Sequence, residues 1–263
     1  MKLSSVSTMI LIASAALLGA CTVTVAPNGG DRPAAADPAS SADFGRQLKE
    51  FAKNDPEGFA DLVANAQSLA RQKQQAASAE RTRKFLTTHP DQVYRNPADP
   101  VLGNPDGDVT VVEWFDNECP FCKKLSPEIE RLIERDPNIR VVMKEFPILG
   151  PVSDLSAKYA LAAMKQGRYR EFHMALMTSA VAEHQLTDAQ LRDFAKTAGL
   201  DVERMVKDSQ DPEIARQIAA THSLAASLGV SATPGLLVGT KIYSGPRTAE
   251  AILNEVAAAR GKG

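Results

Sequence analysis

Apolar residues in the N-terminal third of the chain recur at helical spacing. Phe44, Leu48 and Phe51 fall on one face of a short helix. After the Asn54-Asp55-Pro56 break, an apolar stripe continues at the same spacing, which predicts a second helix. This stripe comprises Phe59, Leu62, Val63, Ala66, Leu69 and Ala70. The second helix can continue through the polar, Ala-rich residues 72–84 as a rod of roughly 45 Å.

The apolar stripe of these helices must be buried against another surface. It either folds back onto its own domain or packs against the same helix of a second or third subunit. The polar stretch from Arg71 to Lys84 carries too little apolar surface to lie along a domain, which favours self-association. We therefore predict a helical oligomerisation segment over residues 43–88, and hence a homo-oligomer.

The remainder of the chain combines short apolar runs with long helical patterns. Residues 89–108 hold four prolines and mark a domain boundary, near which a larger domain begins at about residue 101. Its predicted elements are a strand at 109–115, a helix after 119, a strand at 138–146, helices throughout about 151–228, strands at 235–239 and 241–243, and a helix at 248–259. This order is that of an α/β, thioredoxin-like fold with an inserted α-helical domain, spanning residues 101–259.

The first 20 residues have the pattern of a secretory signal peptide. A Met-Lys start precedes an apolar segment, residues 9–18, that is too short to span a bilayer comfortably. The following Leu18-Gly19-Ala20-Cys21 resembles a bacterial lipobox, in which the cysteine is lipidated and becomes the first mature residue. The alternative is an ordinary signal cut near Ala20, which would leave Cys21 as an unpaired thiol in an oxidising compartment. Either way, we predict export.

Residues 21–42 are predicted to be a flexible tether, because they are rich in Pro, Gly, Ala and Ser and have no apolar periodicity. A coil of about 20 residues spans on the order of 25 Å, so a lipid on Cys21 would keep the folded part near the membrane. Thr22 follows this cysteine in place of an aspartate, which in enterobacterial sorting favours the outer membrane.

Composition narrows the range of functions. The chain has 263 residues, of which 44% are hydrophobic and 24% charged, enough for one large domain with an appendage. Removing residues 1–20 deletes Lys2 and no acid, so the formal charge moves from -2 to -3, with 29 basic and 32 acidic residues. Nothing in this balance indicates a nucleic-acid partner. With Cys21, Cys119 and Cys122 as its only cysteines, the chain cannot form a framework of structural disulfides.

The strongest chemical signal is Cys119-Pro120-Phe121-Cys122, which follows the apolar run at 109–115. Two thiols at this spacing, where a strand gives way to a helix, indicate a redox pair. With Pro120 at the first helical position, Cys119 caps the helix and Cys122 lies one turn in, within reach of a disulfide. We expect Cys119 to face solvent as the nucleophile, favoured as a thiolate by the helix dipole and free N–H groups, and Cys122 to be the buried resolving thiol.

Glu113 is an acid on an otherwise apolar strand, with Val111 and Phe115 on its face. Burial near the thiols would raise its pKa, so that it could relay protons to Cys122, which must lose a proton to attack a mixed disulfide. The other reading is a buried ion pair with Lys144, on the neighbouring strand between Val142 and Phe146. The two readings are compatible, so Glu113 and Lys144 are both candidate site residues.

Residues 101–259 resemble the DsbA family of bacterial periplasmic thiol:disulfide oxidoreductases. Four features carry the resemblance: the Cys-Pro-Phe-Cys turn, Glu113 six residues upstream of Cys119, the central helical insertion, and the segment Ser231-Ala232-Thr233-Pro234 before the next strand. The front of the chain, with its Asp-Pro helix leading into residues 99–104, also resembles a DsbA-like subgroup that carries an N-terminal helical oligomerisation segment.

The resemblance implies roles for Pro234 and Thr233. Pro234 aligns with the cis-proline that faces the cysteine pair, where exposed backbone lets an extended polypeptide substrate pair beside the site. A plain turn proline is the alternative, since most X-Pro bonds are trans. Thr233 holds the position that tunes thiolate contacts in the family, and threonine there is also found in isomerase-type relatives. No cofactor is implied.

The chain departs from the best-known family member between the cysteines. That enzyme has a histidine there, whereas Phe121 offers no charge to stabilise the thiolate. Glu118 should oppose ionisation of Cys119, and Lys123 and Lys124 should partly offset this effect. We therefore expect a pKa of Cys119 below that of a free thiol but above that of the strongest oxidants, and a less oxidising couple.

These observations predict an exported thiol:disulfide oxidoreductase that forms or isomerises disulfides in secreted proteins. The expected partners are unfolded or misoxidised exported proteins and a membrane redox partner that no residue identifies. The expected location is the bacterial periplasm, with a lipid anchor at Cys21.

Two other functions use the same fold. A periplasmic copper- or metal-handling protein would use Cys119 and Cys122 as soft ligands for Cu(I) or Zn. The four histidines, however, are scattered without ligand spacing: His89, His173, His184 and His222. A chaperone-like binding protein would hold clients without redox chemistry, so its activity would survive replacement of Cys119 by serine.

Overall fold

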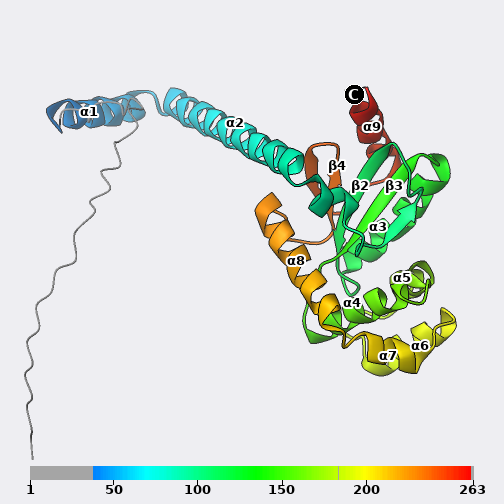
Figure 1. The fold of residues 1–263 in the computed structure, drawn as a ribbon. Coiled ribbons are helices and arrows are strands. Elements are labelled where there is room, and N and C mark those ends of the chain that lie inside the picture. Colours follow the sequence, from blue (N-terminus) through cyan, green and yellow to red (C-terminus); the bar gives the residue numbers. More distant parts are fainter. Residues whose placement is uncertain (1–37, 183, 262–263) are drawn as a thin grey trace, which may run out of the picture. The chain divides into compact units, whose positions relative to one another are not determined.

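The computed structural model describes residues 38–182 and 184–261 (Figure 1). The predicted signal peptide, Cys21 and most of the predicted tether lie outside these residues. The described chain forms two compact units, which divide between Ala66 and Gln67. Within the described ranges, no helix is both long and apolar enough to cross a membrane.

The N-terminal unit consists of helix α1 (Pro38–Asn54) and the first part of helix α2 (Pro56–Thr88). Helix α1 thus includes residues 38–42, the last five residues of the predicted tether. The expected break is present because Asp55 caps α2: its carboxylate accepts the N–H of Gly58 at 2.9 Å. The apolar stripe predicted from the sequence remains on the surface of the single chain, with Phe44 65% and Leu62 51% exposed.

The second unit is built on a five-stranded sheet of order β1-β3-β2-β4-β5 (Figure 1). The strands are β1 (Val101–Gly103), β2 (Val109–Phe115), β3 (Ile139–Glu145), β4 (Gly235–Val238) and β5 (Lys241–Ser244). Strands β2 and β3 are parallel and the other neighbours are antiparallel. Helix α3 (Pro120–Arg135) connects β2 to β3 and starts directly at the cysteine turn.

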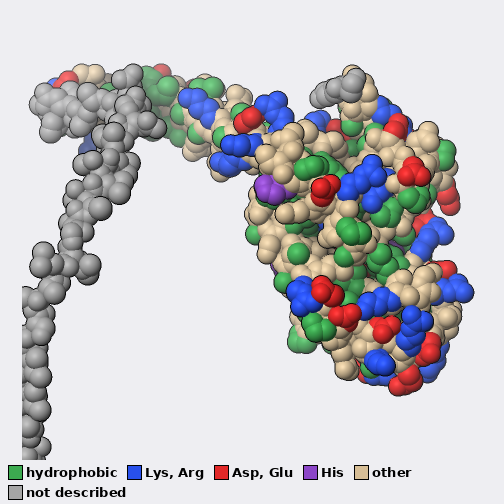
Figure 2. Space-filling model, viewed as in Figure 1, with side chains coloured by type: hydrophobic (Ala, Val, Ile, Leu, Met, Phe, Trp, Pro, Cys, Tyr) green, Lys and Arg blue, Asp and Glu red, His purple; other side chains and the backbone are tan. Residues whose placement is uncertain are grey.

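Helices inserted between β3 and β4 form the predicted α-helical domain. They are α4 (Pro151–Met164), α5 (Tyr169–Met177), α6 (Asp188–Thr197), α7 (Val202–Asp208) and α8 (Pro212–Leu228), and α9 (Ala249–Arg260) ends the fold. A capping box precedes α6: the side chains of Thr187 and Gln190 each accept the backbone N–H of the other residue. In the view of Figure 2, basic and acidic side chains are intermixed over α6 and α7. The predicted fold class and element order are confirmed.

The two faces of the sheet lie in two separate cores. One face packs with α3, α9 and the inserted helices, in a core that includes Val111, Phe115 and both cysteines. The other face, with Val112 and Trp114, packs against Leu86 of α2 and Leu224 of α8. Because successive side chains of a strand point to opposite faces, this division decides which polar residues can reach the thiols.

The proline-rich boundary segment, residues 89–108, contains two short elements that its sequence pattern did not predict. A π-helical turn, η1 (Asp91–Arg95), follows α2, and the three-residue edge strand β1 pairs with β3. Tertiary contacts hold both elements in place. Arg140 of β3 donates to the carbonyl of Tyr94, whose hydroxyl in turn donates to the carbonyl of Gly239 at 3.3 Å.

Candidate active site

The cysteine pair lies where the sequence places it, at the start of a helix. Cys119 is the N-cap of α3 and has extended backbone, and Pro120 occupies the first helical position. The carbonyl of Cys119 accepts the N–H of Lys123 at 3.0 Å, which closes the first turn around Cys122. Both thiols are free. The predicted cap geometry is confirmed.

Cys119 does not face solvent as expected. Only 4% of the residue is exposed, compared with 1% for Cys122, whereas Phe121 between them is 50% exposed. The reason is a tertiary contact with the segment before β4, where Sγ of Cys119 lies 3.4 Å from the carbonyl oxygen of Thr233. The sulfur of Cys119 is therefore largely covered, and it lies next to the exposed ring of Phe121.

The Thr233–Pro234 peptide bond is cis, as the resemblance implied. The carbonyl of Pro234 has a hydrogen-bond donor within the fold, the N–H of Gly245, at 2.9 Å. The residue that faces the thiol is Thr233, which is partly exposed. Thr233 and Pro234 thus lie beside the cysteines although they are more than 100 residues away in the sequence.

The environment of Cys119 favours the thiolate. A hydrogen bond from Cys122 is the largest effect that lowers the pKa of Cys119, to about 6, against the opposing effect of burial. Thr233 and the backbone N–H groups of Cys122 and Phe121 lower it further. The predicted direction is confirmed, although the main cause is the partner thiol rather than the helix terminus.

Cys122 and Glu113 keep their protons more strongly than free groups do. Burial is the main reason that the pKa of Cys122 is far above its ordinary value, and the hydrogen bond to Cys119 adds to it. Burial also raises the pKa of Glu113 to about 8, and the negative charge of Cys119 contributes. Glu113 is 3% exposed on the sheet face that carries the cysteines, as expected. The negative charge of an ionised Glu113 in turn contributes to the raised pKa of Cys122.

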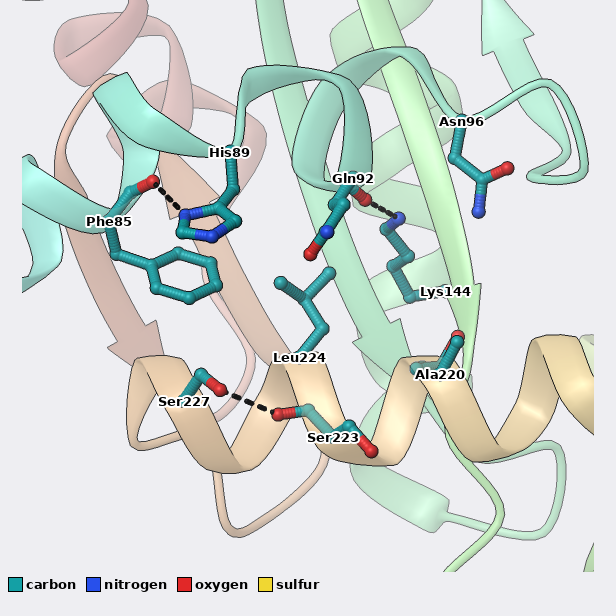
Figure 3. Close-up of a pocket in the computed structure, with 10 residues that line it drawn as sticks. Phe85, His89, Gln92, Asn96, Lys144, Ala220, Ser223, Leu224 and Ser227 are labelled. Atoms are coloured by element: carbon teal, nitrogen blue, oxygen red, sulfur yellow. Dashed lines mark hydrogen bonds between the residues drawn. The ribbon is translucent and has the colours of Figure 1, made fainter.

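The predicted ion pair between Glu113 and Lys144 is wrong. The parallel register places Met143 opposite Glu113, so Lys144 points to the other face of the sheet. There Lys144 forms a buried ion pair with Asp99 and donates to the carbonyl of Gln92 at 2.8 Å. Figure 3 shows it at the side of a cavity of about 590 Å³ between the end of α2, η1 and α8.

The histidines do not converge. His173 is buried against Phe115 and Tyr169 in the core that holds the cysteines, whereas His89 stacks on Phe85 and His222 packs against Phe146 at a tilt. Burial lowers the pKa of His173 to about 4, so the ring is neutral. Within residues 38–182 and 184–261, no three His, Cys, Asp or Glu side chains come together as a metal site.

Sequence reasoning missed three polar residues beside the site. Asp116 and Asn117, in the turn before Cys119, and Glu145, at the end of β3, are all buried. Asn117 donates to the carboxylate of Glu145 at 2.9 Å. The only signal available in the sequence was the run of polar residues between a buried strand and a helix cap, which is also typical of an exposed turn.

Comparison with known proteins connects this site to a family. Residues 110–257, more than half of the chain, match the model of the DSBA-like thioredoxin domain. A thioredoxin-like oxidoreductase from Silicibacter pomeroyi DSS-3 is 40% identical, with a TM-score of 0.63, and the match covers 65% of this chain and 97% of that one. A linker-deletion variant of Proteus mirabilis ScsC is 21% identical, with a TM-score of 0.65, covering 88% and 100% of the two chains, a likeness of fold.

Curated relatives match this chain over part of their longer sequences. The Na(+)/H(+) antiporter NhaA 3 of Salinispora tropica is 32% identical over 162 residues, which are 59% of this chain and 24% of the antiporter. This chain therefore spans about a quarter of the length of that relative.

Proposed function

This chain belongs to the DSBA-like thioredoxin domain family, and from that membership we propose that it catalyses thiol–disulfide exchange on exported proteins through Cys119 and Cys122. The observation that carries the proposal is the opposite tuning of two adjacent thiols. Cys119 ionises readily beside a cis-proline segment, and Cys122 beneath it keeps its proton next to a buried acid. A nucleophile and a resolving thiol require this difference.

In the oxidised protein, the exchange donates a disulfide to the client. A client thiolate attacks Sγ of Cys119, the Cys119–Cys122 bond breaks, and Cys122 leaves as a thiolate that takes a proton. A second client thiolate then attacks the client sulfur of the mixed disulfide and releases the thiolate of Cys119. The client loses two electrons and the cysteine pair gains them.

In the reduced protein, the same groups reshuffle a client disulfide. The thiolate of Cys119 attacks a client sulfur, and a client thiolate leaves. Another client thiolate can then attack the mixed disulfide and release Cys119, with no net redox change. If instead Cys122 loses its proton and attacks Sγ of Cys119, the client leaves reduced.

Glu113 is proposed to accept that proton. While Cys119 is a thiolate, its charge helps to keep Glu113 protonated. Once Cys119 enters a mixed disulfide the charge is gone, which lowers the pKa of Glu113 and favours the carboxylate. Glu113 can then take the proton of Cys122 in the resolving step.

We further propose that the protein acts in the bacterial periplasm. This is the compartment expected of the DsbA family resemblance and of the predicted signal peptide. Lipidation of Cys21, and anchoring to the outer membrane, stay predictions, since that cysteine lies outside the described residues. Clients would be unfolded or misoxidised exported proteins, and an unidentified membrane redox partner would recharge the cysteine pair.

The exchange function is tested by equilibrating the protein with glutathione buffers. A pKa of about 6 for Cys119 lies between the values of about 3.5 for strong oxidants and about 7 for reducing thioredoxins. We therefore expect one two-electron transition at a potential more reducing than the strongly oxidising extreme of about −120 mV. The same protein should reactivate a scrambled-disulfide client. A couple at that extreme, with no reactivation, would refute the prediction.

Self-association through the N-terminal helices is proposed to favour isomerisation, by keeping an oxidase partner out and presenting several sites to one client. The exposed apolar residues on these helices support the proposal, among them Leu62 and, seven residues on, Leu69, which is 58% exposed. Deleting residues 41–88 would also remove Leu86, which is buried in the core, so point substitutions give a cleaner test.

The double variant Leu62→Gln/Leu69→Gln is expected to be a monomer by light scattering, because it replaces the apolar contact surface with polar groups. It should gain oxidase activity and lose isomerase activity. Asn65→Ala/Gln72→Ala, with the same seven-residue spacing on the same helix, is the control and should stay oligomeric. Unchanged mass and activities in the leucine variant would contradict the proposal that these helices mediate self-association.

A further inference from the structure

The turn that leads into Cys119 consists of three buried polar residues. Asp116, Asn117 and Glu118 are only 1%, 2% and 4% exposed. Burying polar groups is unfavourable unless they find partners, so the partners of these three side chains show what holds the turn in place. Each of them is held from a different part of the helical insertion or of the chain that leads into it.

Asp116 connects the turn to the start of α4. One carboxylate oxygen accepts the N–H of Ile148 at 2.7 Å, the N–H of Leu149 at 3.0 Å and the hydroxyl of Ser153. The other oxygen accepts the N–H of Glu118 at 2.8 Å. A single buried carboxylate therefore fixes both the turn and the first residues of the insertion.

Asn117 connects the turn to α5 through Glu145. Its amide donates to one carboxylate oxygen of Glu145 at 2.9 Å, and the hydroxyl of Tyr169 in α5 donates to the other at 3.0 Å. Glu145 is the last residue of β3, on the same sheet face as Glu113. Its two carboxylate oxygens therefore each have a hydrogen-bond partner, one in the turn and one in α5.

Glu118 and Lys123 connect the site to residues 178–187, the segment between α5 and α6. Burial raises the pKa of Glu118, and the nearby backbone N–H of Leu186 opposes this effect. Lys123, one turn into α3, donates to the carbonyl of Val181 at 2.7 Å and to the hydroxyl of Ser179 at 3.1 Å. Residues on both sides of the cysteine pair thus contact the same segment.

We propose that the helical insertion sets the position of Cys119 through these three anchors, with Asp116, Glu145 and Tyr169 as positioning residues for the nucleophile. The backbone N–H of Cys119 donates to the carbonyl of Asp116 at 3.0 Å, so a shift of the turn moves the thiol directly. A client or partner that displaces the insertion would then change the reactivity of the thiol. The inference deepens the proposed exchange function, but its readout needs no client.

Loss of an anchor should raise the pKa of Cys119. The thiolate depends on short contacts with Cys122, Thr233 and the N–H groups at the start of α3, and such contacts weaken steeply with distance and angle. Tyr169→Phe removes one hydroxyl and leaves the ring in place. Tyr159→Phe is a matched control, because the hydroxyl of Tyr159 donates to Asp188 at 2.7 Å within the insertion and does not reach the turn.

The test is the pH dependence of Cys119 alkylation by iodoacetamide in the full chain, followed by peptide mass spectrometry. We expect Tyr169→Phe to raise the pKa of Cys119 by about half a unit, which is roughly threefold less thiolate at low pH. Tyr159→Phe should leave it unchanged. Glu145→Gln, which can still bond both Asn117 and Tyr169, should stay near the wild-type pKa, whereas Glu145→Ala should raise it.

Equal shifts in the two tyrosine variants, or no shift in Tyr169→Phe, would overturn the proposal. If Tyr169→Phe does not fold, Ser153→Ala tests the Asp116 anchor with the same measurement, and the same rise in pKa is expected. A shifted pKa in a protein that exchanges no client disulfide would refute the proposed function and leave the anchors standing. Normal exchange with an unshifted pKa would support the proposed function and overturn the inference about the anchors.

Discussion

Replacing Cys122 with serine is expected to turn exchange into a trap, in which client proteins accumulate as mixed disulfides on Cys119. The nucleophile keeps its helix cap and its contact with Thr233, but no second thiol remains to break the bond to the client. Replacing Cys119 with serine should instead reduce exchange to the uncatalysed background, because a hydroxyl does not react with disulfides. Non-reducing electrophoresis followed by mass spectrometry distinguishes the two outcomes.

In the wild-type protein, the rate at which Cys119 attacks a disulfide or an alkylating reagent should follow the ionisation of its thiol. Above a pH of about 6 most of this thiol is thiolate, and below it the reactive fraction falls about tenfold per pH unit. A free thiol would instead lose reactivity already below its ordinary pKa of about 8.5. The rate should therefore stay nearly flat between pH 7 and 8 and drop steeply below 6.

The same pair of variants separates the proposed function from its rivals. A chaperone-like binding protein would retain client binding in Cys119→Ser, and none of its complexes would be sensitive to reductant. If Cys122→Ser traps no client, and the wild-type thiols do not join to each other under oxidising buffers, thiol exchange is not the function of this site.

The cap geometry of the cysteines was predictable because it is local. The spacing of Cys119 and Cys122, with Pro120 after the first, specifies a helix start without reference to the rest of the fold. The same holds for the Asp55-Pro56 break between the first two helices. The order of elements followed from hydrophobic periodicity and was enough to give the fold class.

Contacts between distant segments could not be predicted in this way. The sequence does not state strand register, and a shift of one residue moves a side chain to the opposite face, which is why Lys144 was given the wrong partner. The cover over Cys119 comes from Thr233, 114 residues further along the chain. Asp116, Asn117 and Glu145 have partners 24 to 37 positions away in the chain, so no local pattern identifies them.

Breaking the buried ion pair between Lys144 and Asp99 is expected to have a large effect on stability. The side chains of Lys144 and Asp99 are 2% and 1% exposed, and the ammonium group also bonds the carbonyl of Gln92. Replacing Asp99 with alanine would leave a buried lysine without its counter-charge. Removing one partner of a buried ion pair costs roughly 3–5 kcal/mol. We expect Asp99→Ala to lower the free energy of unfolding by about this amount in urea titrations.

The double variant Asp99→Ala/Lys144→Met distinguishes a coupled pair from two independent polar residues. Once the lysine is gone no charge remains to be compensated, and methionine fills much of the same space opposite Trp114 on the neighbouring strand. The double variant should therefore recover most of the stability that Asp99→Ala loses, giving a large interaction energy in the mutant cycle. Losses that simply add would show that each residue stabilises the fold separately, through contacts such as that of Gln217 in α8 with Asp99.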